Sequence, residues 1–206
     1  MSPHPSAATA AAERWLGENE DELIRIRRHL HANPELGRQE YRTTAYLVER
    51  LEQAGLVAKV LGGGTGVVCD IGTGEGPVVV LRADIDALPL PDEKDVPYRS
   101  TVDGVCHACG HDVHTAVLLG AAFVLAGMAD RLQGTVRLLF QHAEELMPGG
   151  AIDVLAEGWF QGVSSAFALH CDPASASPVR MTSSGSGFRT STRTGRRRLT
   201  SGPSGI

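Results

Sequence analysis

The stretch Val78-Val79-Val80-Leu81-Arg82-Ala83-Asp84-Ile85-Asp86 decides the fold class that we expect for this chain. Its first four residues are apolar without alternation, which is typical of a strand that is buried on both faces of a sheet. Arg82, Asp84 and Asp86 follow at the carboxyl end of that strand. In α/β folds, chemistry is concentrated at the carboxyl ends of the strands. The stretch therefore predicts a fold class and also the edge of the sheet where a site would lie.

The residues on either side of this stretch alternate between helical and strand patterns. Helices are expected at residues 7–31, 39–53, 111–132 and 150–157, and further strands at residues 57–61, 66–71, 135–141 and 165–169. Asn33-Pro34 ends the first helix, because the residue before a proline avoids helical backbone angles. This alternation indicates an α/β fold with helices on both faces of a mixed, mostly parallel sheet.

The composition of the 206 residues, with 42% hydrophobic and 21% charged residues, is that of a globular protein. It excludes a fibrous, collagen-like or wholly disordered chain. The longest apolar run, residues 115–128, is too short to span a bilayer, and the first five residues lack the pattern of a secretory signal. We therefore expect a cytoplasmic protein without a membrane partner. The four cysteines are too few for a disulfide scaffold, and Cys69 is expected to be a small buried apolar residue.

The chain changes in composition after Pro173. Residues 174–206 hold six arginines and no acidic residue, and they are rich in serine, threonine and glycine, whereas residues 1–173 are acidic. The acidic part argues against nucleic-acid binding, because it has no basic stripe to face phosphates. The apolar residues of the tail follow no period, so we expect the tail to be disordered. A basic arm for nucleic acid or membrane is the less favoured interpretation.

The sharpest local signal is Cys106-His107-Ala108-Cys109-Gly110-His111-Asp112-Val113-His114. Its thiols, imidazoles and carboxylate are ligand types for zinc, manganese or nickel. Gly110 permits a tight turn into the following helix, so that Cys109 and His111 can point toward one centre. Two alternatives stay open, a redox pair formed by Cys106 and Cys109 and a closed structural zinc knuckle.

Glu144-Glu145 and His170 supply polar groups at the ends of two other expected strands. Adjacent residues at a strand end point in different directions, so one carboxylate can hold a metal while its neighbour faces the substrate water. Alone, such a glutamate pair is typical of a solvated loop. A single histidine there is typical of a residue that forms ordinary hydrogen bonds and binds no ligand. Their shared place at the strand ends favours a site.

Five motifs occur in order along the chain. They are Arg28–His31 with Pro34–Gly37, Leu81–Pro89, His107–Asp112, Phe140–Glu145 with Gly149–Ala151, and Ala168–His170. Together they resemble the M20 metallopeptidase family, in its amidohydrolase branch of N-acyl-amino-acid, hippurate and auxin-conjugate hydrolases. The resemblance covers about residues 20–173. It implies that residues 1–173 form the N-terminal part of a zinc-peptidase-like catalytic domain, which is incomplete.

The resemblance also implies a two-metal hydrolase that splits a small N-acyl amino acid into a carboxylic acid and an amino acid. Cys109 would be the bridging thiolate. His111, Glu145 and His170 would be further ligands of two divalent ions, which could be Zn, Mn, Ni or Co. Glu144 would be the general base that takes a proton from water.

Other residues in or near these motifs have less definite roles or depart from the family pattern. Asp84 lies where the family has a carboxylate that orients a ligand, and strand-end capping is the alternative for both Asp84 and Asp86. His114 is expected to support the site or to face the substrate, and a packed helix histidine is the alternative. Val113 and His142 depart from the glycine and proline that the family usually has at these positions.

The family pattern stops after Pro173 in this interpretation. Family members are about twice as long, and the lid domain through which they often dimerise, together with a final histidine ligand, is absent here. We therefore expect the 206-residue chain to have little or no hydrolase activity, and residues 174–206 to be a frameshifted or degenerate end. The non-enzymatic alternative is a metal-binding remnant without turnover.

Overall fold

The computed structural model describes residues 7–171 and 179–185, with side-chain environments for residues 9–171. In chain order its elements are α1 (Ala7–Ala32), α2 (Tyr41–Gln53), β1 (Ala58–Val60), β2 (Val67–Gly72), β3 (Val78–Asp84), α3 (His111–Ala126), the 3-10 helix η1 (Ala129–Arg131), β4 (Thr135–Gln141), α4 (Gly150–Ala156), β5 (Val163–Cys171) and β6 (Val179–Gly185). This succession confirms the expected alternation of helices and strands. No described helix is both long enough and apolar enough to cross a membrane.

The strands form one mixed sheet, which over the described residues has the order β1-β2-β4-β3-β5-β6. Central strand β3 runs parallel to β4 and β5, whereas β1–β2, β2–β4 and β5–β6 pair antiparallel. A mixed sheet is confirmed, but the expectation that it is mostly parallel is wrong. A parallel pair needs a long crossover, and β1 and β2 are joined only by the short segment 61–66.

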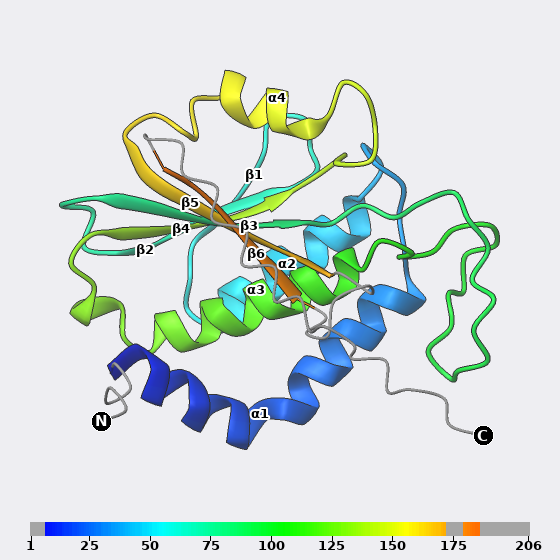
Figure 1. The fold of residues 1–206 in the computed structure, drawn as a ribbon, viewed down its shortest axis with the longest axis horizontal. Helices are drawn as coiled ribbons and strands as arrows, with labels where there is room; N and C mark the ends of the chain where they lie inside the picture. Colours follow the sequence, from blue (N-terminus) through cyan, green and yellow to red (C-terminus); the bar gives the residue numbers. More distant parts are fainter. Residues whose placement is uncertain (1–6, 172–178, 186–206) are drawn as a thin grey trace, which may run out of the picture.

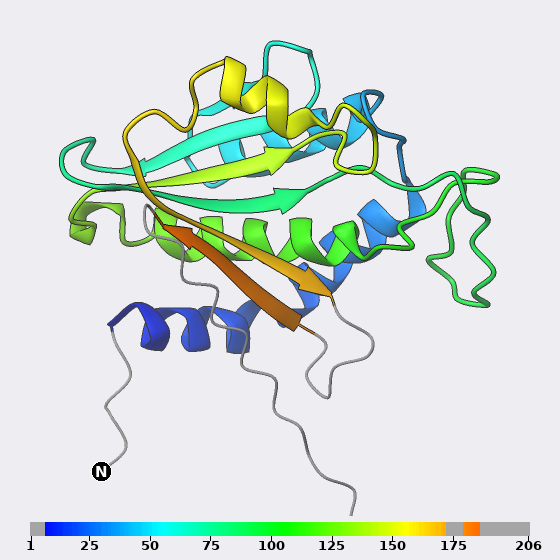
Figure 2. The ribbon, with the colours of Figure 1, turned by 45° about the horizontal axis from the view of Figure 1, so that its top comes forward.

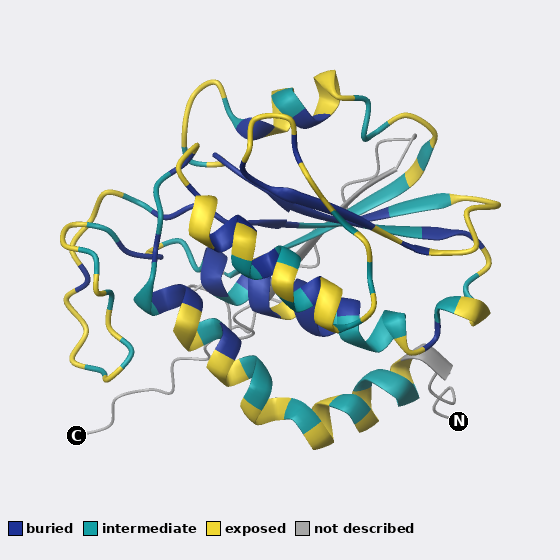
Figure 3. Cartoon of the chain, turned by 180° about the vertical axis from the view of Figure 1, so that it is seen from behind, coloured by how far each residue is buried: buried dark blue, intermediate teal, exposed yellow. Residues whose placement is uncertain are grey.

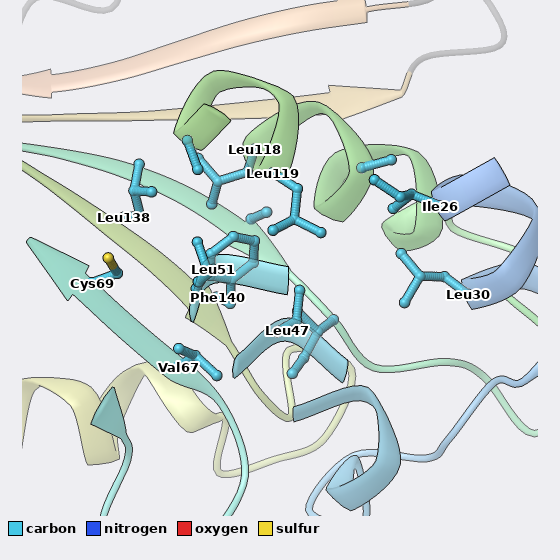
Figure 4. Close-up of a cluster of buried hydrophobic side chains, with 14 of the residues drawn as sticks. Ile26, Leu30, Leu47, Leu51, Val67, Cys69, Leu118, Leu119, Leu138 and Phe140 are labelled. Carbon is cyan, nitrogen blue, oxygen red and sulfur yellow. The ribbon is translucent and has the colours of Figure 1, made fainter. Parts of the chain in front are cut away.

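Helices cover both faces of the sheet, as expected. Figures 1 and 2 show α4 on one side and α1, α2 and α3 on the other. The larger core lies between the sheet and these three helices, and Figure 4 shows its side chains converging on Phe140 of β4. This core joins Ile26 and Leu30 of α1 to Leu47 and Leu51 of α2, and it includes Cys69. Burial raises the pKa of the Cys69 thiol to about 11, which confirms Cys69 as a small core residue.

The α4 side holds a smaller core made by Leu61, Val68, Val80, Leu139 and Val154. Helix α4 has seven residues, so it covers only part of this face. A cavity of about 420 Å³ remains between α4 and the sheet, with Arg82 and Gln141 at its polar end. Figure 3 shows the contrast with α3, which is buried along much of its length, whereas α1 is more exposed.

Three differences from the expected elements affect the architecture. Strand β3 continues to Asp84, and several of its residues are only half-buried, so it is less enclosed than its apolar run predicted. Helix α3 ends at Ala126 instead of continuing to 132, because Gly127 follows and the chain turns into η1. Strand β6 lies within residues 174–206, where we expected disorder, and it pairs with β5 from Ser165 to Cys171. The other residues of that tail lie outside the described ranges.

Candidate metal centre

The candidate centre lies where the carboxyl ends of β3, β4 and β5 meet the start of α3. The parallel register places Asp84 opposite Gln141 and Arg82 opposite Ala168. The residues that follow Gln141 and Ala168 therefore emerge at the same edge of the sheet as Asp84. This geometry confirms the expected gathering of polar residues at the strand ends.

His111 is common to all three groups of possible metal ligands among the described residues. Within each group the ligand atoms lie within 4.8 Å of one another, and the groups are Cys109–His111–His170, His111–Glu144–Glu145 and Asp84–His111–His114. Cys109 Sγ is 3.3 Å from His170 Nε2. His111 Nε2 is 3.9 Å from Glu144 Oε2 and 3.7 Å from Glu145 Oε1. The structure thus brings together every residue that the family resemblance implied as a ligand or base.

The turn between Cys109 and His111 depends on Gly110. Its φ is +85°, in the left-handed region that glycine adopts without strain. A Cβ at this position would lie 3.1 Å from both Cβ and Sγ of Cys171. The Gly110 carbonyl accepts hydrogen bonds from the backbone N–H groups of Val113 and His114, which starts α3. This turn directs Cys109 and His111 to the same centre.

Two atoms of the centre show that it suits a cation. His111 Nε2 and Glu145 Oε1 are buried, and neither has a hydrogen-bond partner. Buried polar atoms are rarely left unpaired, because their desolvation is costly. A thiol, two imidazoles and a carboxylate around these atoms form a donor set that zinc and related ions bind. The residues present therefore fit a divalent metal.

The surrounding charges favour a cation as well. Burial raises the pKa of Cys109 to about 12, and Glu145, Asp84 and Glu144 add to the rise by disfavouring a thiolate. Burial by itself would lower the pKa of His111, but its hydrogen bond to Asp86 and the nearby carboxylates outweigh burial and raise this pKa. The acidic groups thus raise the pKa of both residues, in addition to burial at Cys109 and against burial at His111. A divalent cation would offset it and release the Cys109 proton.

His114 is fully engaged in hydrogen bonds. Its Nδ1 is 2.6 Å from Asp84 Oδ1, and its Nε2 accepts a hydrogen bond from the backbone N–H of Cys171 at 2.8 Å. Burial would raise the pKa of Asp84, but the hydrogen bond with His114 and the charge of Arg82 lower it to about 2. Asp84 and His114 therefore tie the ends of β3 and β5 together and support the strand that carries His170.

Asp86 and Glu40 hold the centre in ways that the sequence analysis missed. Asp86 Oδ1 is 3.2 Å from His111 Nδ1, and Asp86 Oδ2 accepts a hydrogen bond from the Glu145 backbone N–H at 2.9 Å. Glu40 is fully buried and accepts a hydrogen bond from the Ala143 backbone N–H at 2.7 Å. The spacing of Asp84 and Asp86 in one motif could have suggested Asp86. No local signal pointed to Glu40.

Cys106 lies apart from this arrangement. It is buried and belongs to none of the three ligand groups, and its Sγ is 3.8 Å from the Pro91 carbonyl oxygen. Cys106 and Cys109 are both free cysteines. His107, in the same motif, is buried with neither ring nitrogen hydrogen-bonded, and burial lowers its pKa to about 4. Of the two thiols, only that of Cys109 faces the candidate centre.

Similarity to known proteins agrees with this site. The chain is 50% identical over 155 residues to the putative glutamate–cysteine ligase 2-3 of Rhodococcus jostii, and it covers 19% of that protein. It is 48% identical over 155 residues to the N-acetyl-L-cysteine deacetylase of Bacillus subtilis, of which it covers 37%. Each alignment uses 75% of this chain. The chain thus spans less than half the length of these relatives.

A solved structure of similar fold is that of the Bacillus subtilis YXEP protein, described as a dinuclear metal binding peptidase from the M20 family. The TM-score is 0.73 at 43% identity, over 77% of this chain and 44% of that one. The profile of peptidase family M20/M25/M40 matches residues 80–184. This match ends eleven residues beyond Pro173, after which we expected the family pattern to stop. Because the matched residues make up half of the chain and include most of the candidate centre, the chain belongs to peptidase family M20/M25/M40.

Proposed function

We propose that this chain provides the metal-binding part of an amidohydrolase that cleaves the amide bond between an acyl group and an amino acid. The observation that carries the proposal is the convergence of Cys109, Glu145 and His170 on the unpaired Nε2 of His111, with Glu144 at the same place. The similarity to a deacetylase of N-acetyl-L-cysteine supports a small N-acyl amino acid as substrate. The acidic composition of residues 1–173 supports a small molecule over nucleic acid.

Cys109, His111, Glu145 and His170 would hold the two divalent ions. When bound, such ions polarise the amide carbonyl and lower the pKa of a water molecule toward about 7. Glu145 suits a ligand, because its side chain is 24% exposed and its buried Oε1 faces His111. Asp86 orients both His111 and Glu145 through its two oxygens.

Glu144 would act as the general base. Its side chain is 40% exposed, and its Oε2 is 3.9 Å from His111 Nε2, so it can reach both solvent and the centre. The carboxylate would take a proton from the attacking water and pass it to the nitrogen of the departing amino acid. The greater exposure of Glu144 suits a base that exchanges protons with water, and the lesser exposure of Glu145 suits a ligand. We further propose that the protein acts in the cytoplasm.

Metal binding and turnover test this function separately. The purified 206-residue chain is titrated with Co²⁺, and release of cysteine from N-acetyl-L-cysteine is followed by an amine assay in a version of the chain completed to the length of its relatives. Glu144→Gln should keep the metal and lose turnover by about 10²- to 10⁴-fold, because an amide cannot accept the proton of water. Glu145→Gln should weaken metal retention as well, and Glu75→Gln, in an exposed loop, serves as the control.

The outcomes separate the parts of the proposal. Loss of metal in Glu144→Gln, with retention in Glu145→Gln, would show that the two roles are swapped. Metal binding without turnover in the completed chain would keep the metal centre and reject hydrolysis. A wild-type chain that binds no divalent metal would overturn the proposal.

A further inference from the structure

His31 connects three segments of the chain outside the candidate centre. It lies one residue before the end of α1 and is only 1% exposed. Its Nδ1 is 2.7 Å from Asp112 Oδ2, and its Nε2 is 3.1 Å from Asp92 Oδ2. Asp112 belongs to the first turn of α3, and Asp92 belongs to the long irregular segment between β3 and α3. His31 therefore joins α1, α3 and this segment at one buried point.

The two acids that contact His31 also face basic side chains. Ionised carboxylate oxygens accept hydrogen bonds, and each ring nitrogen of His31 lies within hydrogen-bond distance of one of them. Arg27 Nε is 2.8 Å from the same oxygen of Asp112, and Lys94 Nζ is 3.0 Å from Asp92 Oδ1. The two acids thus face three basic groups. Such a buried ionic arrangement needs all of its partners, because an uncompensated buried charge is strongly unfavourable.

The segment that Asp92 anchors is fixed to α1 at other points as well. The Tyr98 ring lies under the guanidinium groups of Arg27 and Arg28, with centroid distances of 5.1 and 4.9 Å. The backbone N–H and the hydroxyl of Thr101 both donate hydrogen bonds to the Ala32 carbonyl oxygen. Figure 1 shows this green segment beside the C-terminal end of α1. Together these contacts attach the segment to the C-terminal end of α1.

This attachment leads directly to the candidate ligands. Leu88 and Cys106 exchange two backbone hydrogen bonds, which closes the segment at its base, three positions before Cys109. On the other side, Asp112 is adjacent to His111 in the first turn of α3. The segment before Cys109 and the turn that carries His111 are thus both tied to His31. Neither Asp92 nor Asp112 belongs to a ligand group.

We propose that His31 is a positioning residue of the metal centre, which holds Cys109 and His111 in place through its simultaneous hydrogen bonds to Asp92 and Asp112. The proposal rests on the proposed function, since it concerns the same centre. An apolar residue would serve if His31 only filled space in the core. The position instead carries a buried imidazole between two carboxylates. Mutation of a residue that orients metal ligands without binding the metal itself typically lowers metal affinity by about 10- to 100-fold.

The test compares His31→Gln with wild type in the full 206-residue chain, by two independent measurements. The first is hydrogen exchange of the backbone amides in the first two turns of α3 without metal, which should become about tenfold faster. The second is the dissociation constant for Co²⁺, which should rise by about 10- to 100-fold. Glutamine carries its two N–H donors on one nitrogen, so it cannot span the two acids as the two separate ring nitrogens of His31 do. Leu51→Ala, a core truncation in α2, is the control for general destabilisation.

Asp92→Asn provides a second variant if His31→Gln does not fold. It keeps the imidazole and removes only the charge on the segment side, so both readouts should change in the same direction by a smaller factor. If Leu51→Ala, compared at matched stability, lost as much Co²⁺ affinity as His31→Gln, the role of His31 would be structural only and the inference would be overturned. Unchanged amide exchange in α3 would also overturn it. If wild type binds no Co²⁺, the proposed function fails, while the exchange measurement still decides the role of His31.

Discussion

Asp86 Oδ2 accepts a hydrogen bond from the backbone N–H of Glu145 at 2.9 Å. The contact links the residues just after β3 to the loop just after β4, and the other oxygen of the same carboxylate faces His111 Nδ1. Burial would raise the pKa of Asp86, but its hydrogen bonds with His111 and with the Glu145 backbone outweigh burial and lower it. One ionised side chain therefore orients two candidate ligands from different elements.

We predict that Asp86→Asn lowers metal affinity by about 10- to 100-fold. Asparagine can accept one of the two hydrogen bonds, but its NH₂ group cannot replace the second acceptor. Isothermal titration with Co²⁺ or Mn²⁺ measures the change. Asp103→Asn, in an exposed part of the segment before α3, should leave the affinity at the wild-type value. Equal affinities for Asp86→Asn and wild type would show that Asp86 only caps the strand end.

Metal content should depend on Cys109 far more than on Cys106. Cys109 Sγ lies 3.3 Å from His170 Nε2, whereas the buried Cys106 thiol faces the Pro91 carbonyl. Cys109→Ser should therefore lose most of its bound metal, because a serine hydroxyl is a much weaker ligand than a thiolate. Cys106→Ser should retain it. Mass spectrometry of the native protein gives the metal content of each variant, and an equal loss in both would favour a closed Cys-His knuckle.

Much of the fold was predictable because local patterns specify it. The apolar run from Val78, Asn33-Pro34 after α1, and Gly110 before α3 act through backbone preferences and burial of nearby residues. These signals located the elements and placed the candidate site at the strand ends. Strand direction could not be obtained in the same way. The antiparallel pairing of β2 with β4 joins strands far apart in the chain, and no local pattern records it.

The contacts that orient the site were the least predictable part. The sequence places Asp84 and Asp86 two residues apart, but it does not tell which partner each carboxylate reaches. In the structure Asp84 pairs with His114 and Asp86 with His111. Glu40 reaches Ala143 across more than a hundred residues. Such pairings depend on the packing of whole elements, so residue type and spacing alone could not specify them.

Gly110→Ala should harm the site more than an equivalent change elsewhere. A non-glycine residue at a positive φ costs about 1–2 kcal/mol, and here the new Cβ would also press on Cys171 at 3.1 Å. Gly55→Ala is a matched control, since Gly55 has a φ of +77° and no atom within 4 Å of an added Cβ. Urea unfolding should show a larger loss for Gly110→Ala, and Co²⁺ titration should show weaker binding for that variant alone. Similar metal affinities in both variants would contradict the role of this turn.

Glu22 gives a prediction of pH dependence away from the candidate centre. Its carboxylate links α1 to Arg50 of α2 and pairs with Arg25 at 2.6 Å. Hydrogen bonding with Arg25, followed by the charges of Arg50 and Arg25, outweighs burial and lowers the pKa of Glu22 below its ordinary value of 4.5. The folded state thus favours the ionised form. The stabilisation is fully present above the unfolded-state pKa and is lost as the pH falls through the lower, folded-state pKa.

We therefore predict that Glu22→Gln lowers the free energy of unfolding at pH 7 by less than about 1 kcal/mol, since the ion pairs are partly exposed to solvent. The difference from wild type should shrink as the pH falls below about 4.5, because protonated glutamic acid and glutamine are then both neutral. Urea unfolding at intervals from pH 7 to pH 3 measures it, with the exposed Glu18→Gln of α1 as the control. Added salt should reduce the difference at pH 7. A difference that stays constant over this pH range would show that Glu22 contributes by packing and not by its charge.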